Sequence, residues 1–391
     1  MADLLTADGL RRFDAVAAAH VAADKVPGLV ALVARGDQVH VTAPGSLSAG
    51  GPPVRRDSVF RIASVTKLAT GAATLALVRE GRLALDEPVD RLLPELANRR
   101  VLRRMDGPLD DTIPARRAIT VRDLLTFTFG FGFVAEMFGA GQPWPVAAAT
   151  DELHLSTIGW PNLPEQPDPD TWIAGLGSLP LIAQPGQRWM YNTGASVLGV
   201  LLARAAGEPF GDVLRTRLFE PLGMRDTGFW TTGTGRLATA YRPVPDGLEV
   251  WDEPGGYWSK PPTFPDGAAG LVSTADDLLA FARMLLRGGD PVLSPAAVAE
   301  MTRDQLTPAQ KAYGGLGPGF FEDVSWGFCT SVITAGPQAG AFGWAGGFGS
   351  TWLADPARDL TVIVLTQRAL EGPQPPAVHT ELQDAAYAAL P

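Results

Sequence analysis

Cysteine is almost missing from this chain of 391 residues, in which Cys329 is the only one. A single cysteine can form neither an intramolecular disulfide nor a cysteine-based metal cluster. Histidine is also scarce, and its four copies stand without metal-ligand spacing at His20, His40, His154 and His379. The string GFGFVA at Gly130 resembles a dinucleotide loop but has no strand, turn and helix around it. We therefore expect no zinc or other metal site and no cofactor.

Long apolar runs and a basic surplus are missing as well. No run of about 18 uncharged apolar residues occurs, so we expect no membrane-spanning helix. The first residues lack a basic region followed by an apolar core, and we expect a cytoplasmic protein without a secretory signal. The net charge of -10 argues against a nucleic-acid partner, because phosphate binding needs a basic face. A neutral or cationic small molecule suits this charge better.

What the chain does contain is enough apolar sequence for a large core, with 46% hydrophobic and 19% charged residues. The β-rich runs lie towards its two ends. LVALVAR and QVHVT near the start predict a hairpin, and WGFCTSVIT, AFGWAGG, STWLADP and LTVIVLTQ predict consecutive antiparallel strands near the end. Helical spacing predicts terminal helices over 8–23 and 376–390. The pattern predicts an α+β fold, in which terminal helices cover one antiparallel sheet built from both ends of the chain.

The middle of the chain reads as a separate, mainly helical lobe. We place the mixed lobe at 1–62 and 266–391 and the helical lobe at 63–265. Within the helical lobe, 141–185 is rich in proline, and its composition predicts a long irregular lid or binding wall. A surface insertion with buried tryptophans is the alternative. This segment carries Trp144, Trp160 and Trp172.

Two further local features can be predicted after this insertion. Residues 246–265 read as a loop that contains tryptophan. Ser273 and Asp276 have the spacing of a capping box, which predicts the start of a helix that stops at Gly288.

Ser64 and Lys67 form an S-x-x-K pair. Alternation just before Ser64 predicts a short strand, and helical spacing after it continues to Gly81, so the hydroxyl and the amine project from one helix face about one turn apart. A serine hydroxyl needs a base beside it, and a lysine serves only when it is largely neutral near pH 7. Burial and the positive end of a helix both lower a lysine pKa. The alternative is that Ser64 caps the helix and Lys67 is solvated.

Six strings occur in an order that is similar to a known group of proteins. They are SVTK at Ser64, LLTFTFG at Leu124, PGQRWMYNTG at Pro185, PLGMRDTGF at Pro221, GLVSTADDL at Gly270 and WAGG at Trp344. Together they resemble the serine β-lactamase and DD-peptidase superfamily, in particular its class C branch, and most closely the family VIII carboxylesterases. The resemblance covers about 30–367 and implies an antiparallel sheet, a helical lobe and an active site in the crevice between them.

The resemblance also implies roles for individual residues. Ser64 is the nucleophile and Lys67 is the base that takes its proton. Tyr191 falls on the family tyrosine that passes the proton to the leaving group, a role that requires a positive field to lower its pKa. The backbone N–H groups of Ser64 and Gly347 form the oxyanion hole. The alternatives are that Tyr191 is a core aromatic with a satisfied hydroxyl and that Gly347 belongs to a tight β-turn.

Departures from the family pattern bear on the substrate. Trp344 and Ala345 stand where the β-lactamases carry the Lys and Thr of K-T-G, so we expect no efficient β-lactam turnover. Asn192 lies one position before the place of the family asparagine, which Thr193 occupies. We expect an apolar cleft for a neutral ester. The predicted substrate-binding residues are Trp344, Gly346, Asn192, Phe127, Phe129, Trp144, Trp160 and Trp258.

The sequence therefore predicts a serine hydrolase that cleaves a small-molecule carboxylic ester through an acyl-serine intermediate. No G-x-S-x-G string occurs, so an α/β-hydrolase elbow is not indicated. Three alternatives stay open: acyl transfer to an alcohol, hydrolysis of an amide or D-amino peptide, and a catalytically idle penicillin-binding-like protein. The oligomeric state also stays open.

Overall fold

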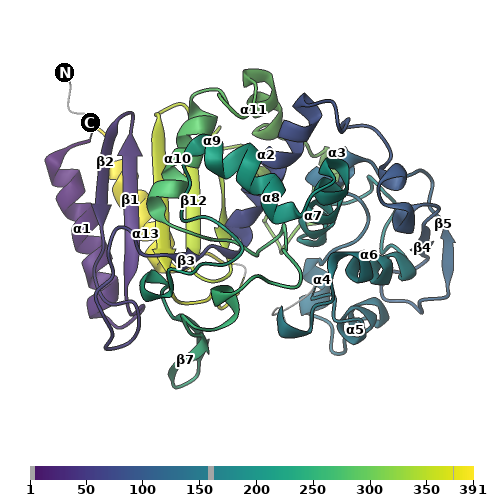
Figure 1. Cartoon of the computed structure of the whole chain (residues 1–391), viewed down its shortest axis with the longest axis horizontal. Helices are drawn as coiled ribbons and strands as arrows, with labels where there is room; N and C mark the ends of the chain where they lie inside the picture. Colours follow the sequence, from purple (N-terminus) through teal and green to yellow (C-terminus); the bar gives the residue numbers. More distant parts are fainter. Residues whose placement is uncertain (1–4, 157–162, 373) are drawn as a thin grey trace.

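The computed structural model describes residues 5–156, 163–372 and 374–391. Its central element is a seven-stranded antiparallel sheet to which both ends of the chain contribute (Figure 1). This arrangement confirms the predicted α+β fold. In spatial order the strands are β2 (Gln38–Thr42), β1 (Leu29–Arg35), β13 (Leu360–Thr366), β12 (Ser350–Asp355), β11 (Phe342–Gly346), β10 (Ser331–Ile333) and β9 (Val324–Trp326).

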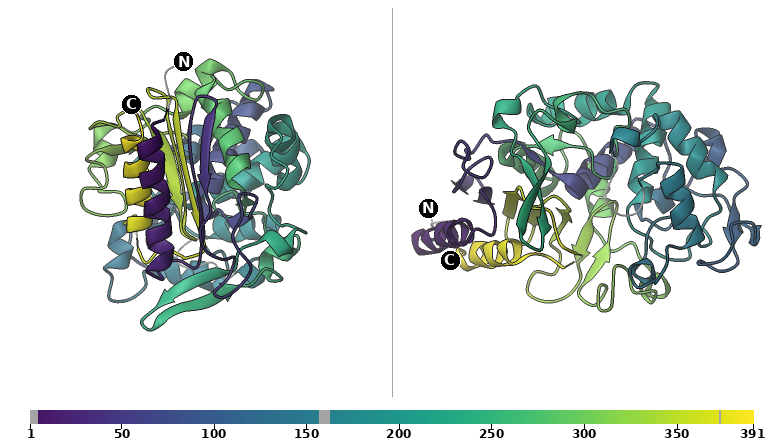
Figure 2. Two further views of the ribbon diagram at one scale, coloured as in Figure 1. Left: turned by 90° about the vertical axis from the view of Figure 1, so that its left-hand side faces the viewer. Right: turned by 90° about the horizontal axis from the view of Figure 1, so that it is seen from below.

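Successive residues of the central strands point to opposite faces of the sheet. Ala31 and Val33 of β1 pack against the terminal helices α1 (Ala7–Ala22) and α13 (Ala377–Ala388), which lie side by side on one face (Figure 2). Leu32, between them, belongs to the main core on the other face. Because β1 and β13 are buried on both faces, they read as continuous apolar runs rather than as alternating ones. Both terminal helices were predicted to within two residues.

Most other helices come from the middle of the chain and lie to the right of the sheet in Figure 1. The helix α10 (Ala275–Leu286) instead packs against β1, β12 and β13 on the sheet face opposite the terminal helices. None of the helices in the described ranges is both long and apolar enough to cross a membrane. The lobe boundaries at 62/63 and 265/266 stay a prediction. The helices are α2 (Thr66–Arg79), α3 (Val121–Leu125), α4 (Ala135–Phe138), α5 (Pro145–Glu152), α6 (Pro169–Ser178), α7 (Thr193–Ala206), α8 (Phe210–Leu214), α9 (Glu220–Leu222), α10 (Ala275–Leu286), α11 (Pro295–Met301) and α12 (Pro308–Lys311). The short strand pairs are β3 (Phe60–Arg61) with β8 (Val272–Ser273), β4 (Arg100–Leu102) with β5 (Thr112–Pro114), and β6 (Ala240–Val244) with β7 (Gly247–Asp252).

Helix α2 positions the S-x-x-K pair. Every residue from Thr66 to Leu77 is buried, so the helix has no solvated face. A helix without a solvated face belongs in a core. Close packing is possible partly because of Gly71, where a Cβ atom would lie 2.9 Å from the Phe328 carbonyl oxygen. Lys67, in the first turn of this helix, is therefore buried together with its apolar neighbours.

Two local predictions are wrong. Residues 246–265 are not a loop throughout, because β7 occupies part of this range and pairs with β6. The Pro-Asp-Gly turn at 245–247, which favours a hairpin, was the overlooked signal. The helix α10 is capped by Thr274, whose side chain accepts a hydrogen bond from the Asp277 N–H, and not by Ser273. Ser273 belongs to β8, where it pairs with Phe60 of β3.

The segment 141–185 is more regular than its proline content predicts. Its described part contains α5 and α6, so the prediction of a long irregular lid is wrong there. Proline at the first helical position is compatible with both helices, because that N–H needs no intrahelical partner. Trp172 is fully buried, donates its indole N–H to the Leu155 carbonyl and stacks on Phe264, as the packing alternative expects.

We expect Leu382→Ala to lower the free energy of unfolding by about 2–5 kcal/mol, because it leaves a cavity where α13 packs on the sheet. Leu382 has no exposed surface. Asp384→Ala, on the exposed side of the same helix, should change stability by less than about 0.5 kcal/mol. Urea unfolding of both variants measures the difference, and equal effects would contradict the packing of α13 described above.

Candidate active site

Ser64 lies in a tight turn, Ala63–Val65, that links β3 to α2. Ala63 and Val65 are buried, whereas Ser64 is partly exposed and is therefore the accessible residue of the turn. Ala63 has a φ of 43°, which is a left-handed conformation that costs a residue with a Cβ about 1–2 kcal/mol. Strained backbone of this kind persists where the surrounding structure holds it, often beside functional groups.

Lys67 has no exposed surface, and its Nζ atom has three oxygen neighbours. Nζ lies 2.8 Å from Asn192 Oδ1 and 2.7 Å from the Ala268 carbonyl oxygen, both of which can only accept hydrogen bonds. It also lies 2.9 Å from Ser64 Oγ. A neutral amine has two hydrogens and one lone pair. The two acceptors take the hydrogens, which leaves the lone pair to receive the proton of the Ser64 hydroxyl.

The pKa of Lys67 agrees with this arrangement. Burial lowers the pKa of this amine to about 7, against the opposing influence of Asp266 and Cys329. Desolvation disfavours the charged form, and the polar neighbours recover only part of the lost hydration. Lys67 is therefore substantially neutral at physiological pH, and the alternative of a solvated first-turn lysine is wrong.

Asn192 is placed by an unusual backbone conformation. It immediately precedes α7 and has a φ of 81° and a ψ of -67°, the geometry of a strained γ-turn, in which the Thr193 N–H donates to the Tyr191 carbonyl at 3.2 Å. In this conformation its side chain reaches Lys67, although Asn192 lies one position earlier than the family pattern expects. Asn192 is partly exposed, so its predicted contact with substrate stays a prediction beside this contact with Lys67.

Tyr191 lies beside both members of the pair. Nζ of Lys67 is 4.7 Å from the centre of its ring, and its hydroxyl hydrogen-bonds with Ser64. Burial raises the pKa of Tyr191 to about 12, although the hydrogen bonds with Ser64 and Trp344 act in the opposite direction. The expectation that a positive field lowers the pKa of this phenol is therefore wrong. Desolvation of the phenol outweighs any positive field. Lys67 in its neutral form supplies no such field.

Trp344 determines the direction of the hydrogen bonds at Tyr191. Its indole N–H donates to the Tyr191 oxygen at 2.5 Å. Because an indole can only donate, the phenol proton is free to point at Ser64 Oγ. The result is a chain of hydrogen bonds donated in one direction, from Trp344 through Tyr191 and Ser64 to the lone pair of Lys67. Trp344 is partly exposed, so its predicted contact with substrate stays a prediction beside its hydrogen bond to Tyr191.

The two glycines of the third motif differ in their surroundings. A Cβ atom at Gly346 would lie 2.3 Å from the Ile62 carbonyl oxygen, so glycine lets β11 approach the Ser64 turn. Gly346 is buried and acts as a packing residue, contrary to its predicted contact with substrate. Gly347 is exposed, and a Cβ atom there would meet open space. The Leu370 N–H holds the Gly347 carbonyl at 2.8 Å.

Most of the predicted pocket aromatics are core residues. Phe127 and Phe129 have no exposed surface, and Phe127 packs edge-on behind Tyr191 with 6.0 Å between ring centres. Trp258 is also buried, and its indole donates to the Gly270 carbonyl at 2.8 Å. Pocket roles for these three residues are wrong, because apolar rings gain most by leaving water altogether. Trp144 is partly buried against the main core, and Trp160 lies outside the described residues.

Several groups around the Ser64–Lys67 pair were not predicted from the sequence. The Ala268 carbonyl contacts Lys67 through its backbone, which leaves no trace in the residue type. The Asp266 carboxylate and the Cys329 thiol both act on the charge of Lys67. Phe133 and Phe320 are partly exposed near Tyr191 and Trp344, with ring centres 5.2 Å and 6.4 Å from theirs, respectively. The PGQRWMYNTG and GLVSTADDL strings lie close to some of these groups in the sequence. They indicated the region of the site but not the individual contacts.

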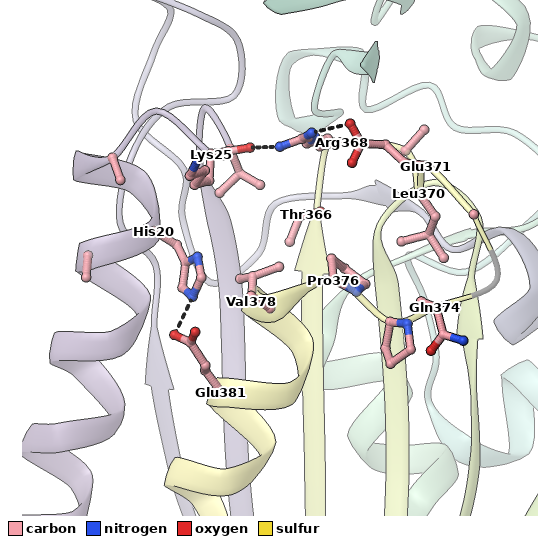
Figure 3. Close-up of a pocket in the computed structure, with 17 residues that line it drawn as sticks. His20, Lys25, Thr366, Arg368, Leu370, Glu371, Gln374, Pro376, Val378 and Glu381 are labelled. Atoms are coloured by element: carbon pink, nitrogen blue, oxygen red, sulfur yellow. Dashed lines mark hydrogen bonds and ion pairs between the residues drawn. The ribbon is translucent and has the colours of Figure 1, made fainter. Parts of the chain in front are cut away.

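A cavity of about 800 Å³ lies elsewhere, between α1, α13 and the segment after β13 (Figure 3). Its side chains pair with one another: His20 lies 3.0 Å from Glu381, and Arg368 donates to Glu371 at 2.8 Å. None of the predicted site residues lines this cavity. Within the described ranges, no group of His, Cys, Asp and Glu side chains has the arrangement of a metal site.

We expect the rate at which a fluorophosphonate labels Ser64 to rise with pH and to reach half its maximum near pH 7. Below this pH Lys67 is protonated and cannot accept the serine proton, since its pKa is about 7. Mass spectrometry of the adduct over a pH series measures the midpoint, and Ser64→Ala supplies the background. A midpoint near that of an ordinary lysine would contradict the neutral amine.

Comparison with known proteins agrees with this geometry. The β-lactamase family model matches residues 13–387. An uncharacterised protein of Mycobacterium tuberculosis is 40% identical over 81% of this chain and 79% of its own length. The esterase EstB of Burkholderia gladioli is 33% identical over 96% of this chain and 95% of its own. Among solved structures, EstCE1, described as a hydrolase with promiscuous acyltransferase activity, has a TM-score of 0.79 at 28% identity, over 97% of this chain and 99% of that one. The chain belongs to the β-lactamase family, as one of its serine hydrolases.

Proposed function

We propose that this protein is a carboxylesterase that works through an acyl-serine intermediate on Ser64. The observation that carries the proposal is the contact of the Ser64 hydroxyl with a buried, substantially neutral Lys67. The sequence similarity to the esterase EstB over nearly the whole chain supports an ester as the substrate. The assignment to the family VIII carboxylesterases and a cytoplasmic location are parts of the same proposal.

In the acylation step, Ser64 Oγ attacks the ester carbonyl carbon while its proton passes to Lys67 Nζ. The carbonyl oxygen becomes an oxyanion that the N–H groups of Ser64 and Gly347 stabilise. Lys67 then returns the proton, with Tyr191 as the relay, and the alcohol leaves. The phenol of Tyr191 enters the step protonated, in keeping with its raised pKa of about 12.

In the second step, water attacks the acyl-serine carbonyl. Its proton passes to the now neutral Lys67 and then to Ser64 Oγ as the C–O bond breaks, so the acid is released and the serine hydroxyl is restored. The same groups therefore act first as base and then as acid. No charge has to leave the site during the cycle.

The surroundings of the site favour an apolar acyl or alcohol group. Phe133, Phe320 and Trp344 are partly exposed around Tyr191. The third motif offers an indole and a methyl group where β-lactamases carry an ammonium and a hydroxyl, so it lacks the groups that hold a drug carboxylate. A neutral ester, such as p-nitrophenyl butyrate, fits these walls.

Acyl transfer to an alcohol is the second candidate function. EstCE1 favours it, since that hydrolase is described as having promiscuous acyltransferase activity. The chemistry differs only in whether water or an alcohol attacks the acyl-serine. Product analysis with an added alcohol separates the two functions. Release of acid alone supports hydrolysis, and formation of a new ester supports transfer.

Ser64→Ala should abolish turnover of p-nitrophenyl butyrate, and Lys67→Ala should be nearly as severe, because the two groups act as a unit. Initial rates of purified, folded variants measure the effect. Retention of more than a small fraction of activity in Ser64→Ala would defeat the proposal. Absence of any ester or phosphonate adduct in the native protein would instead favour an idle penicillin-binding-like protein.

Trp344→Phe should lower kcat for p-nitrophenyl butyrate roughly threefold to tenfold, which is the value of one lost hydrogen bond to a buried group. The phenylalanine ring keeps the apolar wall but cannot donate to Tyr191. We expect KM to change less than kcat. A rise in KM at constant kcat would show that Trp344 serves substrate binding alone.

A further inference from the structure

The Ala268 carbonyl that accepts the Lys67 hydrogen bond belongs to a turn, 266–270, between β7 and β8. A carbonyl has to be held firmly to orient a lysine, since the lysine side chain is long and flexible. The turn is closed by the Gly270 N–H, which donates to the Asp266 carbonyl at 3.0 Å. The other contacts of this turn therefore affect the active site. The inference drawn from them rests on the proposed function.

The Asp266 carboxylate is the centre of these contacts. Its Oδ1 atom accepts hydrogen bonds from Ser196 Oγ at 2.7 Å and from the Ala268 N–H at 2.9 Å. Ser196 lies on α7, the helix that follows Asn192. The same carboxylate therefore connects Ala268, which contacts Lys67, to α7, the helix that begins directly after Asn192.

The neighbouring residue of the turn is anchored to α2. The Gly267 carbonyl accepts a hydrogen bond from Thr70 Oγ1 at 2.7 Å. A Cβ atom at Gly267 would lie 2.4 Å from the Ala195 carbonyl oxygen, so the turn is wedged between α2 and α7. Asp266 supplies the side-chain contacts on the α7 side, and Thr70 supplies one on the α2 side.

We propose that Asp266 is a positioning residue of the active site, which holds the Ala268 carbonyl against Lys67 Nζ and, in its carboxylate form, places a negative charge behind the amine. The first effect orients the lone pair of Lys67 towards Ser64. The second limits how far burial can neutralise the lysine, so that Asp266 sets the pH range in which the enzyme works.

The charged and titratable groups that face Lys67 are few. Asp266 and Cys329 both favour the ammonium form, and Asp266 is the larger influence. The Cys329 thiol is itself kept neutral, because burial raises its pKa. Tyr191 faces the amine with its ring, and its raised pKa keeps it neutral too. Asp266 faces Lys67 and Tyr257, whose pKa burial and this carboxylate raise to about 12.

Burial raises the pKa of Asp266, and its two hydrogen bonds and Lys67 act against this rise. Removing the carboxylate charge takes away an interaction that favours protonated Lys67. The pKa of Lys67 should then fall, and the acid limb of the pH profile should move to lower pH. Replacing a residue that served folding alone would leave the acid limb of the pH profile unchanged.

The test is the pH profile of kcat/KM for p-nitrophenyl butyrate with Asp266→Asn. The asparagine Oδ1 still accepts both hydrogen bonds, so this variant removes the charge and keeps the turn. At pH 6 the native enzyme should retain about a tenth of its plateau activity, given a Lys67 pKa of about 7. We expect Asp266→Asn to retain a severalfold larger share of its own plateau.

Asp277→Asn is the matched control. Asp277 is another buried carboxylate, which accepts hydrogen bonds from Thr227 Oγ1 and from the Asp226 N–H, both at 2.8 Å. It undergoes the same chemical change but does not act on the charge of Lys67. Its acid limb should coincide with that of the native enzyme. An unmoved limb in Asp266→Asn, or equal movement in both variants, would overturn the proposal.

Asp266→Glu tests the positioning effect and also serves if Asp266→Asn does not fold, as judged by circular dichroism. The longer side chain keeps the charge but displaces the turn, so kcat should fall while the acid limb stays in place. Unchanged kcat would overturn the proposal. Failure of the proposed function has a different signature, because native activity would then survive Ser64→Ala or Lys67→Ala.

Discussion

The burial of one lysine is the constraint on which the rest of the site depends. A buried ammonium without a paired anion is costly, and a lysine relieves this cost by losing its proton. Lys67 follows this course, with its pKa lowered to about 7, because α2 is enclosed on every side. The Asn192 and Ala268 acceptors direct its hydrogens away from Ser64. The serine hydroxyl is left facing the lone pair of the amine.

Replacing the charged third-motif residue by tryptophan changes the electrostatics of the site. The Trp344 indole satisfies the Tyr191 oxygen without bringing in a positive charge. Tyr191 therefore keeps its proton, and its raised pKa of about 12 follows from burial. The proton moves between a neutral amine and a neutral phenol, and an uncharged substrate can enter without having to match a fixed cation.

The fold brings these groups together from distant parts of the chain. β11 approaches the Ser64 turn through Gly346, where any side chain would strike the Ile62 carbonyl. The sheet that carries β11 is stabilised on its far face by the terminal helices α1 and α13. Segments near residues 64, 191, 268 and 344 thus meet around one amine, and the packing of the sheet holds them there.

The amino-acid sequence by itself determined the architecture and the chemical core. Continuous apolar runs indicated the buried strands, helical spacing indicated the terminal helices, and ordered short motifs indicated Ser64, Lys67 and Tyr191. These features are local, so their periods and spacings survive in the linear chain. The hairpin at 245–247 was also readable from its Pro-Asp-Gly turn and was overlooked.

Only the tertiary structure decided the protonation of the site and the division of its aromatic residues. Whether Phe127 faces a substrate or the core depends on which side chains from other segments cover it, and a linear pattern does not record this. The pKa values of Lys67 and Tyr191 depend on desolvation by the whole surrounding fold. The contact with the Ala268 carbonyl is made by the backbone, which every residue possesses, so no residue type could have indicated it.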